Sequence, residues 1–236
     1  MAYTNFSIET DADGIALITW DMPGKSMNVI DLTVMDELDA LIDAVAGDDK
    51  ITGAVITSGK DTFSGGADLT MLEGLLRDYH AQRAKDPEAA ARLLFDGSRR
   101  LSQIFRKLET SGKPFVAAIN GTCMGGATEL ALACHARIAA EGDVFKMALP
   151  EVKVGLFPGA GGTQRVMRMA DAQQGLQFLL QGRTLNADKA KGLKLVDATA
   201  PAKKLVAEAR KMLKTGVDPV KPWDKKGFKL PNGPIY

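Results

Sequence analysis

Short β-rich runs alternate along this chain with longer stretches in which apolar residues recur at helical spacing. Residues 4–10 and 14–20 flank an Asp-Gly pair, and this combination predicts a β-hairpin. Residues 52–58 and 115–119 are short, largely apolar runs, which are predicted to be buried strands. Strands that alternate with helices along the sequence indicate an α/β fold.

The first helical segment is the most regular one. Asp31 is suited to the N-cap position, and the apolar residues after it recur at helical spacing. These residues are Val34, Met35, Leu38, Leu41, Ile42 and Val45. Further helices are predicted over residues 88–110, 126–134, 171–181, 186–192 and 201–214. Residues 69–87 suggest a short helix and then a charged stretch, which we expect to be a mobile lid or an exposed connection.

The composition argues against several classes of protein. A formal net charge of +1 over 236 residues argues against nucleic acid as the main partner. The polar N-terminus shows no signal peptide, and no apolar run reaches the length of a membrane span. Cys123 and Cys134 fit neither a disulfide framework nor a ligand spacing, which indicates the reducing cytoplasm. His80 and His135 also lack metal-ligand spacing, so no metal site is predicted.

Two isolated carboxylates carry the candidate chemistry. Glu129 lies in an apolar stretch just after two glycines, and Glu151 follows a second strand-like stretch. At a strand-to-helix turn near Gly126, unpaired backbone N–H groups and the helix dipole would form a site for an oxyanion. Two carboxylates beside such a site can act as general acid and base. Structural carboxylates that cap turns or pair with Arg137 or Lys153 are the alternative, and spacing alone leaves both open.

Three segments together resemble the enoyl-CoA hydratase/isomerase (crotonase) family. They are FSGGADL (63–69), NGTCMGGATELALACHARIA (120–139) and LPEVKVGLFPGAGGTQR (149–165), and their order and spacing match as well. The resemblance covers nearly the whole chain. It implies a crotonase fold, in which repeated ββα units form a spiral core of two roughly perpendicular sheets with helices outside.

The resemblance also implies a role for each residue of the site. Glu129 and Glu151 would bracket a water, which Glu129 helps to activate while Glu151 donates a proton to C2 of an enoyl thioester. The backbone N–H groups of Ala67 and Gly126 would form the oxyanion hole. Contacts with the substrate and its coenzyme A are implied for Lys25, Ser26, Asn28, Gly65, Asp68, Leu69, Gly125, Pro158 and Gly159. Coenzyme A arrives as part of the substrate, so no separate cofactor is expected.

Two positions depart from the pattern of many relatives, which carry a third glycine, and often a cysteine, just before the first glutamate. Ala127 and Thr128 stand there in this chain. We expect the Ala127 methyl group to narrow the pocket or to be accommodated, and Thr128 to add a hydroxyl next to the site.

The activity that the resemblance implies is that of a 2-enoyl-CoA hydratase in fatty-acid β-oxidation. Two alternatives are kept. One is a Δ3,Δ2-enoyl-CoA isomerase that uses the same site, and the other is a module that binds or assembles CoA thioesters with little activity alone. An acyl-CoA thioester is the expected small-molecule partner. The resemblance also implies an oligomer or a place in a multienzyme complex.

The C-terminal end differs in composition from the rest of the chain. Residues 1–215 are assigned to the crotonase-like domain. Residues 216–236 resemble the linker that precedes a 3-hydroxyacyl-CoA dehydrogenase in multifunctional enzymes of fatty-acid oxidation, and a following domain is expected to complete the acyl site. This segment has little apolar area to offset its chain entropy. We therefore expect it to lie extended across the domain, anchored by Trp223 and Phe228, or to be poorly ordered.

Overall fold

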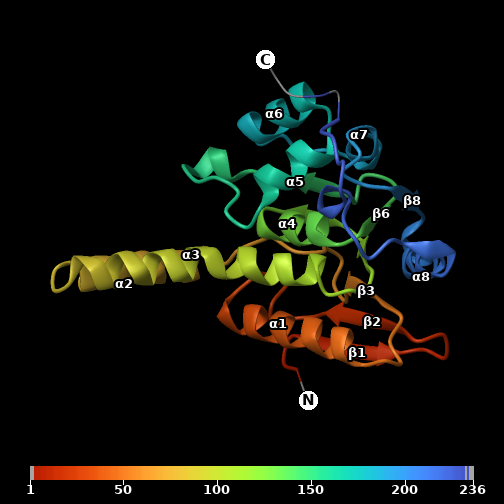
Figure 1. Cartoon of the computed structure of the whole chain (residues 1–236), viewed down its shortest axis with the longest axis horizontal. Coiled ribbons are helices and arrows are strands. Elements are labelled where there is room, and N and C mark those ends of the chain that lie inside the picture. The colour runs from red at the N-terminus through yellow and green to blue at the C-terminus, as the bar shows by residue number, and fades with distance from the viewer. Residues whose placement is uncertain (1–2, 232, 234–236) are drawn as a thin grey trace.

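A six-stranded sheet forms the centre of the structure, a computed structural model that describes residues 3–231 and 233 (Figure 1). Its strands lie in the order β1-β2-β3-β4-β6-β8. They span Phe6–Thr10, Ile15–Trp20, Gly53–Ser58, Phe115–Ile119, Ala136–Ala140 and Ala198–Ala200. β1 and β2 pair antiparallel, and each later pair of neighbours in this sheet is parallel. The predicted hairpin is confirmed, and β3 and β4 confirm the two predicted buried strands.

A second, two-stranded sheet consists of the parallel strands β5 (Thr122–Met124) and β7 (Lys146–Ala148). Each of them follows a strand of the large sheet, since β5 comes after β4 and β7 after β6. A helix comes next in both cases. It is α4 (Gly126–Ala133) after β5, and α5 (Gly162–Met169) after β7 and the 3-10 turn η1 (Glu151–Val154). The chain thus repeats a ββα unit, and each repeat carries one candidate glutamate just after its strand of the small sheet.

The remaining helices surround the two sheets (Figure 1). They are α1 (Leu32–Gly47), α2 (Leu69–Arg83), α3 (Pro87–Glu109), α6 (Ala172–Gln181), α7 (Ala187–Gly192) and α8 (Leu205–Gly216). Two further 3-10 turns are η2 (Ala202–Lys204) and η3 (Pro222–Asp224). Within residues 3–231, no helix combines the length and the apolar character that crossing a membrane would need.

Both faces of the large sheet are buried at its central strands β3, β4 and β6. In β4, Phe115 and Ala117 belong to the larger apolar core, whereas Val116 between them belongs to the smaller one. α8 closes the smaller core with Leu205 and Ala209. A strand that is covered on both faces needs apolar side chains at every position, which explains the continuous apolar runs in the sequence.

The predicted first helix is confirmed as α1. The carboxylate of Asp31 accepts a hydrogen bond from Val34 N at 2.8 Å and so caps the helix. The apolar residues at helical spacing are all buried, namely Val34, Met35, Leu38, Leu41, Ile42 and Val45. This helix packs its predicted face against the larger core.

Residues 69–87 differ from the prediction. α2 continues for 15 residues, so the helix is longer than expected, and only residues 84–86 separate it from α3. The two helices pack side by side and project from the body as a hairpin (Figure 1). No residue of α2 is buried, which explains why its apolar pattern was weak. The charged stretch is the exposed turn of this hairpin.

The C-terminal segment crosses the domain, which is one of the two predicted outcomes. Lys221 is 2% exposed, and its ammonium group donates to the carbonyl oxygens of Leu132, at 2.9 Å, and Cys134. These carbonyls lie at the C-terminal end of α4. The rings of Trp223 and Phe228 meet edge to face with 6.5 Å between their centroids. Lys221 therefore anchors the segment together with Trp223, whose ring contacts Arg168 of α5, whereas the ring contact of Phe228 lies within the segment.

Candidate active site

α4 begins at a backbone turn that strongly favours glycine. Gly125 has φ 54° and ψ −128°, a conformation that residues with side chains rarely adopt. Its N–H donates to Ala148 O at 2.9 Å, which ties the turn to β7. A Cβ on Gly125 would lie 3.1 Å from Oε1 of Glu151. Glycine at this position therefore lets the Glu151 carboxylate lie against the start of α4.

The backbone N–H groups of Ala67 and Gly126 lie near one another at this end of α4. A Cβ on Gly126 would lie 3.6 Å from Ala67 N, and one on Gly66, whose φ is 92°, would lie 3.1 Å from Gly126 N. In the part of the chain that the structure describes, neither N–H donates a hydrogen bond to a protein acceptor. Unpaired donors at a helix N-terminus bind anions, so the turn is suited to hold a negatively charged oxygen.

The Glu129 carboxylate is almost completely shielded from solvent. The residue is 3% exposed, and Oε1 accepts hydrogen bonds from Ala160 N and Gly162 N, both at 2.8 Å. Burial raises the pKa of Glu129 to about 7. The negative charge of Glu151 adds to this rise in pKa, whereas the two N–H groups oppose it. Glu129 can therefore gain or lose a proton close to neutral pH.

Glu151 is the first residue of η1 and is half-buried. Its Oε2 is hidden from solvent and, among the described residues, has no hydrogen-bond partner. Burial raises the pKa of Glu151 and so favours the protonated carboxylic acid. A buried polar atom without a partner is uncommon in folded proteins. This oxygen is therefore a candidate contact for a water or a substrate.

The ion pairs considered as the alternative role of the two glutamates are not formed. Arg137 pairs with Asp197 at 2.7 Å instead. Within residues 3–231, no Lys or Arg nitrogen lies within 4.0 Å of either carboxylate, Lys153 included. Glu129 does accept from the N–H groups of Ala160 and Gly162 and so caps the turn at the start of α5, as the other alternative expected. These N–H groups orient the carboxylate without neutralising it.

The two positions that depart from the family pattern are both part of the core. Ala127 is fully buried in the larger apolar core. The Thr128 hydroxyl is also fully buried, and it donates to Cys123 O at 2.8 Å or Ala148 O at 2.9 Å. The hydroxyl shares the acceptor Ala148 O with the N–H of Gly125, so it lies next to the turn at the start of α4, but its proton is engaged by the backbone. Its hydroxyl joins α4 to both strands of the small sheet.

The two segments assigned to coenzyme A, residues 25–28 and 65–69, lie next to one another. Gly65 N donates a hydrogen bond to Asn28 O, with 2.9 Å between the atoms. A Cβ on Gly65 would lie 2.8 Å from Sδ of Met27. Glycine at this position thus lets the two segments pack in direct contact.

The side chains of these segments differ in what they can offer a ligand. Lys25 and Ser26 are exposed, and Leu69 is 58% exposed. The Asp68 carboxylate accepts a hydrogen bond from Thr70 N at 2.8 Å and caps α2. Lys25, Ser26 and Leu69 are therefore accessible to a ligand, whereas the Asp68 carboxylate is already engaged as the N-cap of α2.

Asn28 holds its loop together through its side chain. The side chain is completely buried, and its amide nitrogen donates to the carbonyl oxygens of Trp20 and Phe63, at 2.9 and 3.1 Å. Its Oδ1 accepts from Met22 N at 3.0 Å. Any contact between Asn28 and coenzyme A would therefore have to use the backbone.

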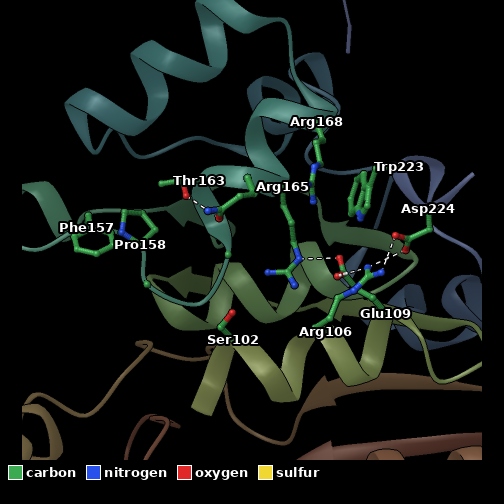
Figure 2. A pocket seen from close by; sticks show the side chains of 13 residues that line it. Ser102, Arg106, Glu109, Phe157, Pro158, Thr163, Arg165, Arg168, Trp223 and Asp224 are labelled. Carbon is green, nitrogen blue, oxygen red and sulfur yellow. Dashed lines mark hydrogen bonds and ion pairs between the residues drawn. The ribbon is translucent and has the colours of Figure 1, made fainter. Parts of the chain in front are cut away.

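A cavity of about 460 Å³ lies between α3, α5, the loop at 157–161 and the C-terminal segment (Figure 2). Pro158 and Gly159 line it, whereas residues 25–28 and 65–69 do not. The structure thus separates the residues assigned to substrate binding into two groups. Glu129 and Glu151 do not line this cavity. Gly159 and Gly161 of the cavity wall flank Ala160, whose N–H donates to Glu129.

Charged side chains in the wall of this cavity form one connected network (Figure 2). Arg165 Nε donates to Glu109 Oε1 at 2.8 Å, and Arg106 contacts Glu109 at 3.2 Å and Asp224 at 2.7 Å. Glu109 and Arg165 are only 3% and 5% exposed. The sequence analysis did not single out these residues. One feature of the sequence could have indicated Glu109. It directly follows Leu108, an apolar residue on the core-facing side of the long helix α3, so its carboxylate would lie at the edge of the core and need a partner.

Comparisons with known proteins identify the family and the fold. A family model described as enoyl-CoA hydratase/isomerase matches residues 10–219. Two bacterial proteins named fatty acid oxidation complex subunit alpha are similar to this chain. That of Idiomarina loihiensis is 40% identical over 197 residues, and that of Shewanella amazonensis is 38% identical over 218. The matches cover 83% and 92% of this chain but only 26% and 29% of the relatives' own length.

A solved structure, that of an enoyl-CoA hydratase from Bacillus anthracis, is similar in three dimensions. The TM-score is 0.75 at 27% sequence identity, and the match covers 89% of this chain and 76% of that one. This likeness confirms the predicted crotonase fold.

Proposed function

The chain belongs to the enoyl-CoA hydratase/isomerase family, and we propose that it adds water to 2-enoyl-CoA thioesters in fatty-acid β-oxidation. The observation that carries the proposal is the pair of carboxylates with raised pKa values, Glu129 and Glu151, at the start of α4. The unpaired N–H groups of Ala67 and Gly126 lie at the same end of this helix. Together these groups supply an acid, a base and an oxyanion site.

In the proposed reaction, the thioester oxygen accepts hydrogen bonds from Ala67 N and Gly126 N. A water between the two glutamates attacks C3 of the enoyl group, and the Glu129 carboxylate accepts a proton from that water. Negative charge moves to the thioester oxygen, where the two N–H groups stabilise the enolate. The Glu151 carboxylic acid then protonates C2. The product is a 3-hydroxyacyl thioester, and one proton transfer from Glu129 to Glu151 restores the starting state.

The surroundings of the two glutamates support these opposite roles. Two N–H groups hold Glu129, and such bonds favour the carboxylate that a base needs. The Glu151 Oε2 lacks any such donor among the described residues, so its protonated form is favoured. Burial raises both pKa values, to about 7 for Glu129, which brings both groups closer to the acid–base range that the reaction needs.

Isomerisation of 3-enoyl to 2-enoyl thioesters is a second candidate for the same site. The Oε2 of Glu151, which has no hydrogen-bond partner among the described residues, supports it, and this reaction would need the Glu151 carboxyl in its ionised form. One carboxylate that removes a proton from C2 and returns it at C4 would suffice, and no water needs to be bound. The enolate would again lie against the N–H groups of Ala67 and Gly126.

We further propose that the chain works within a multienzyme protein of fatty-acid oxidation in the cytoplasm. The printed name of the relatives, fatty acid oxidation complex subunit alpha, supports this setting. The chain spans only 26% and 29% of the length of these relatives, which leaves room in a protein of their size for further enzymes. A 3-hydroxyacyl-CoA dehydrogenase is a suitable one, because it would consume the 3-hydroxyacyl product. The two free, buried thiols of Cys123 and Cys134 fit a reducing compartment.

The deciding experiment follows the ultraviolet absorbance of the conjugated enoyl thioester of crotonyl-CoA as water adds to it. The purified chain should consume crotonyl-CoA and form 3-hydroxybutyryl-CoA, identified by mass. A parallel assay with a 3-enoyl-CoA measures isomerisation. If neither substrate turns over while calorimetry still detects butyryl-CoA binding, the chain is a binding module and the proposed activity is wrong.

A further inference from the structure

We propose that Glu109 and Arg165 are positioning residues, a buried ion pair that holds the 160–162 loop in place and thereby orients the carboxylate of Glu129. This role rests on the proposed function, and it assigns a task to two side chains that do not touch the substrate in the proposed reaction. The contacts that support it run without a break from Glu109 to Glu129.

The first link is the ion pair itself. Arg165 Nε donates to Glu109 Oε1 at 2.8 Å, and both side chains are almost fully buried. Glu109 ends α3, whereas Arg165 lies in α5, so the pair joins two helices that are distant in sequence (Figure 2). Burying two charges is costly unless further hydrogen bonds satisfy them, so an alternative placement of the guanidinium would be penalised.

The second link is the peptide chain around Ala160. Arg165 Nη1 donates to Ala160 O at 2.7 Å, while Ala160 N donates to Glu129 Oε1 at 2.8 Å. Ala160 thus connects the two side chains, since its carbonyl accepts from the Arg165 guanidinium and its N–H donates to the Glu129 carboxylate. Gly162 N, at the start of α5, makes the second bond to Glu129.

The third observation is the fit of the loop around the guanidinium. Gly161 has φ 97°, and a Cβ there would lie 2.3 Å from Arg165 Nη1. The loop therefore wraps the guanidinium so closely that a side chain at position 161 would displace either the loop or the guanidinium. Arginine is suited to this place because its planar fork can serve Glu109 and Ala160 at once, which a lysine ammonium cannot do with the same geometry.

The network continues to the C-terminal segment. Arg106 donates to Glu109 Oε2 at 3.2 Å and makes a two-pronged contact with the Asp224 carboxylate at 2.7 and 2.8 Å. Asp224 lies in η3, next to Trp223 (Figure 2). The C-terminal segment thus contributes to the orientation of Glu109, and through it to the placement of Glu129.

The test compares Arg165→Gln with the control Arg92→Gln in crotonyl-CoA hydration. Arg92 lies in α3, its side chain is 76% exposed, and it pairs with the equally exposed Glu88 away from the cavity. For Arg165→Gln we expect kcat to fall by on the order of 10²-fold with KM nearly unchanged, since small misplacements of a catalytic group have such effects. The acid limb of the pH profile of kcat should move to higher pH, because the positive charge of Arg165 lowers the pKa of Glu129. The control should match the wild type.

A second measurement does not depend on activity. The amide protons of Ala160 and Gly162, assigned by NMR, report their hydrogen bonds to the Glu129 carboxylate. Their resonances should move upfield in Arg165→Gln, less so in Glu109→Gln and Asp224→Asn, and not at all in Arg92→Gln. Because Asp224→Asn leaves the buried pair intact, it reports on the network in a protein that is expected to fold.

The outcomes are distinguishable. If folded Arg165→Gln keeps the wild-type kcat and pH profile, or if the two amide resonances do not move in any variant, Glu109 and Arg165 only stabilise the fold and the positioning role is wrong. If the wild type hydrates no enoyl-CoA, the proposed function fails, and the amide resonances still decide whether the ion pair orients Glu129.

Discussion

Glu129 is subject to two opposing influences. The N–H groups of Ala160 and Gly162 favour its charged form, and they lie at the start of α5, where the helix dipole acts in the same direction. Burial acts against the charge, and it dominates, since the pKa is raised to about 7. The carboxylate is thus held in one orientation and kept close to half-protonation at neutral pH.

A substitution of Glu151 tests the assignment of the acid. Glu151→Gln should keep the fold and the affinity for butyryl-CoA but lower kcat for crotonyl-CoA by about 10²- to 10⁴-fold, because a carboxamide cannot donate the proton to C2. The measurement is steady-state kinetics together with calorimetry. Near-normal turnover in this variant would remove Glu151 from the mechanism.

The raised pKa of Glu129 also predicts a pH dependence of stability. The native state holds the proton more tightly than the unfolded chain, so Glu129 contributes stability at low pH that is lost as pH rises from its ordinary pKa of 4.5 toward about 7. The full effect is at most about 3 kcal/mol of unfolding free energy. Urea unfolding at about pH 5 and about pH 8 measures it.

The control for this prediction is Glu129→Gln, which cannot titrate. The change in unfolding free energy between the two pH values should be more positive in Glu129→Gln than in the wild type. His135, whose pKa burial lowers to about 4, acts in the opposite direction in both proteins and cancels in the comparison. Equal pH dependence in the two proteins would contradict the raised pKa.

The two ends of the short helix α4 carry polar groups of opposite kind, an N–H donor at its start and carbonyl acceptors at its end. Its N-terminal Gly126 N–H is unpaired among the described residues, and its C-terminal carbonyls receive the ammonium group of Lys221. All eight residues of α4 are buried. A helix buried on every side cannot turn or shift easily, so its N-terminus keeps a constant place relative to Ala67.

A bulky residue at the start of α4 should therefore affect activity more than stability. A Cβ at position 126 would lie 3.2 Å from Cδ1 of Ile30 and 3.6 Å from Ala67 N, and valine would extend further into that space. We expect Gly126→Val to lower kcat/KM by on the order of 10²-fold or more, as the loss of an oxyanion donor does elsewhere. Crotonyl-CoA kinetics and thermal unfolding measure the two effects.

Gly47→Val is the matched control for this variant, because a Cβ on Gly47, at the end of α1, meets no atom within 4 Å. It should leave kcat/KM unchanged. If Gly126→Val loses melting temperature in proportion to activity, the effect is one of folding and says nothing about an oxyanion site.

At the scale of the whole molecule, residues 221–224 of the C-terminal segment pack against the domain. Lys221 reaches α4, Asp224 reaches α3 through Arg106, and the ring of Trp223 lies under Arg168 of α5. The predicted boundary at residue 215 therefore divides a segment from a domain with which it packs closely.

Removing the central ring of this segment should lower stability. Trp223 is half-buried and contacts Phe228, Lys221 and Arg168. Trp223→Ala should cost about 2 kcal/mol of unfolding free energy, which is less than for a fully buried aromatic residue. Urea unfolding measures it. Phe95→Ala, at a ring that is 61% exposed, is the control and should change stability little. Equal losses would show that the segment adds no stability of its own.

Local patterns in the sequence were sufficient for the elements whose formation depends on near neighbours. The Asp31 cap, the buried face of α1 and the β-hairpin follow from the spacing of residues within one element, and all were predicted correctly. The apolar run around Glu129 predicted a helix, which the structure confirms as α4. Glu151 was expected at the end of a strand, but β7 ends at Ala148 and Glu151 begins the 3-10 turn η1. The weak pattern of α2 was misjudged because that helix packs only against another projecting helix.

Only the tertiary structure decided which buried polar groups meet. The sequence did not show that the side chains of Thr128 and Asn28 are buried and donate their hydrogen bonds to backbone carbonyls of other segments. The contact between Glu109 and Arg165 joins residues 56 positions apart. Spacing along a chain determines which face of an element a residue occupies. It does not determine which distant donor will satisfy a buried acceptor, because that depends on how the packed elements bring their surfaces together.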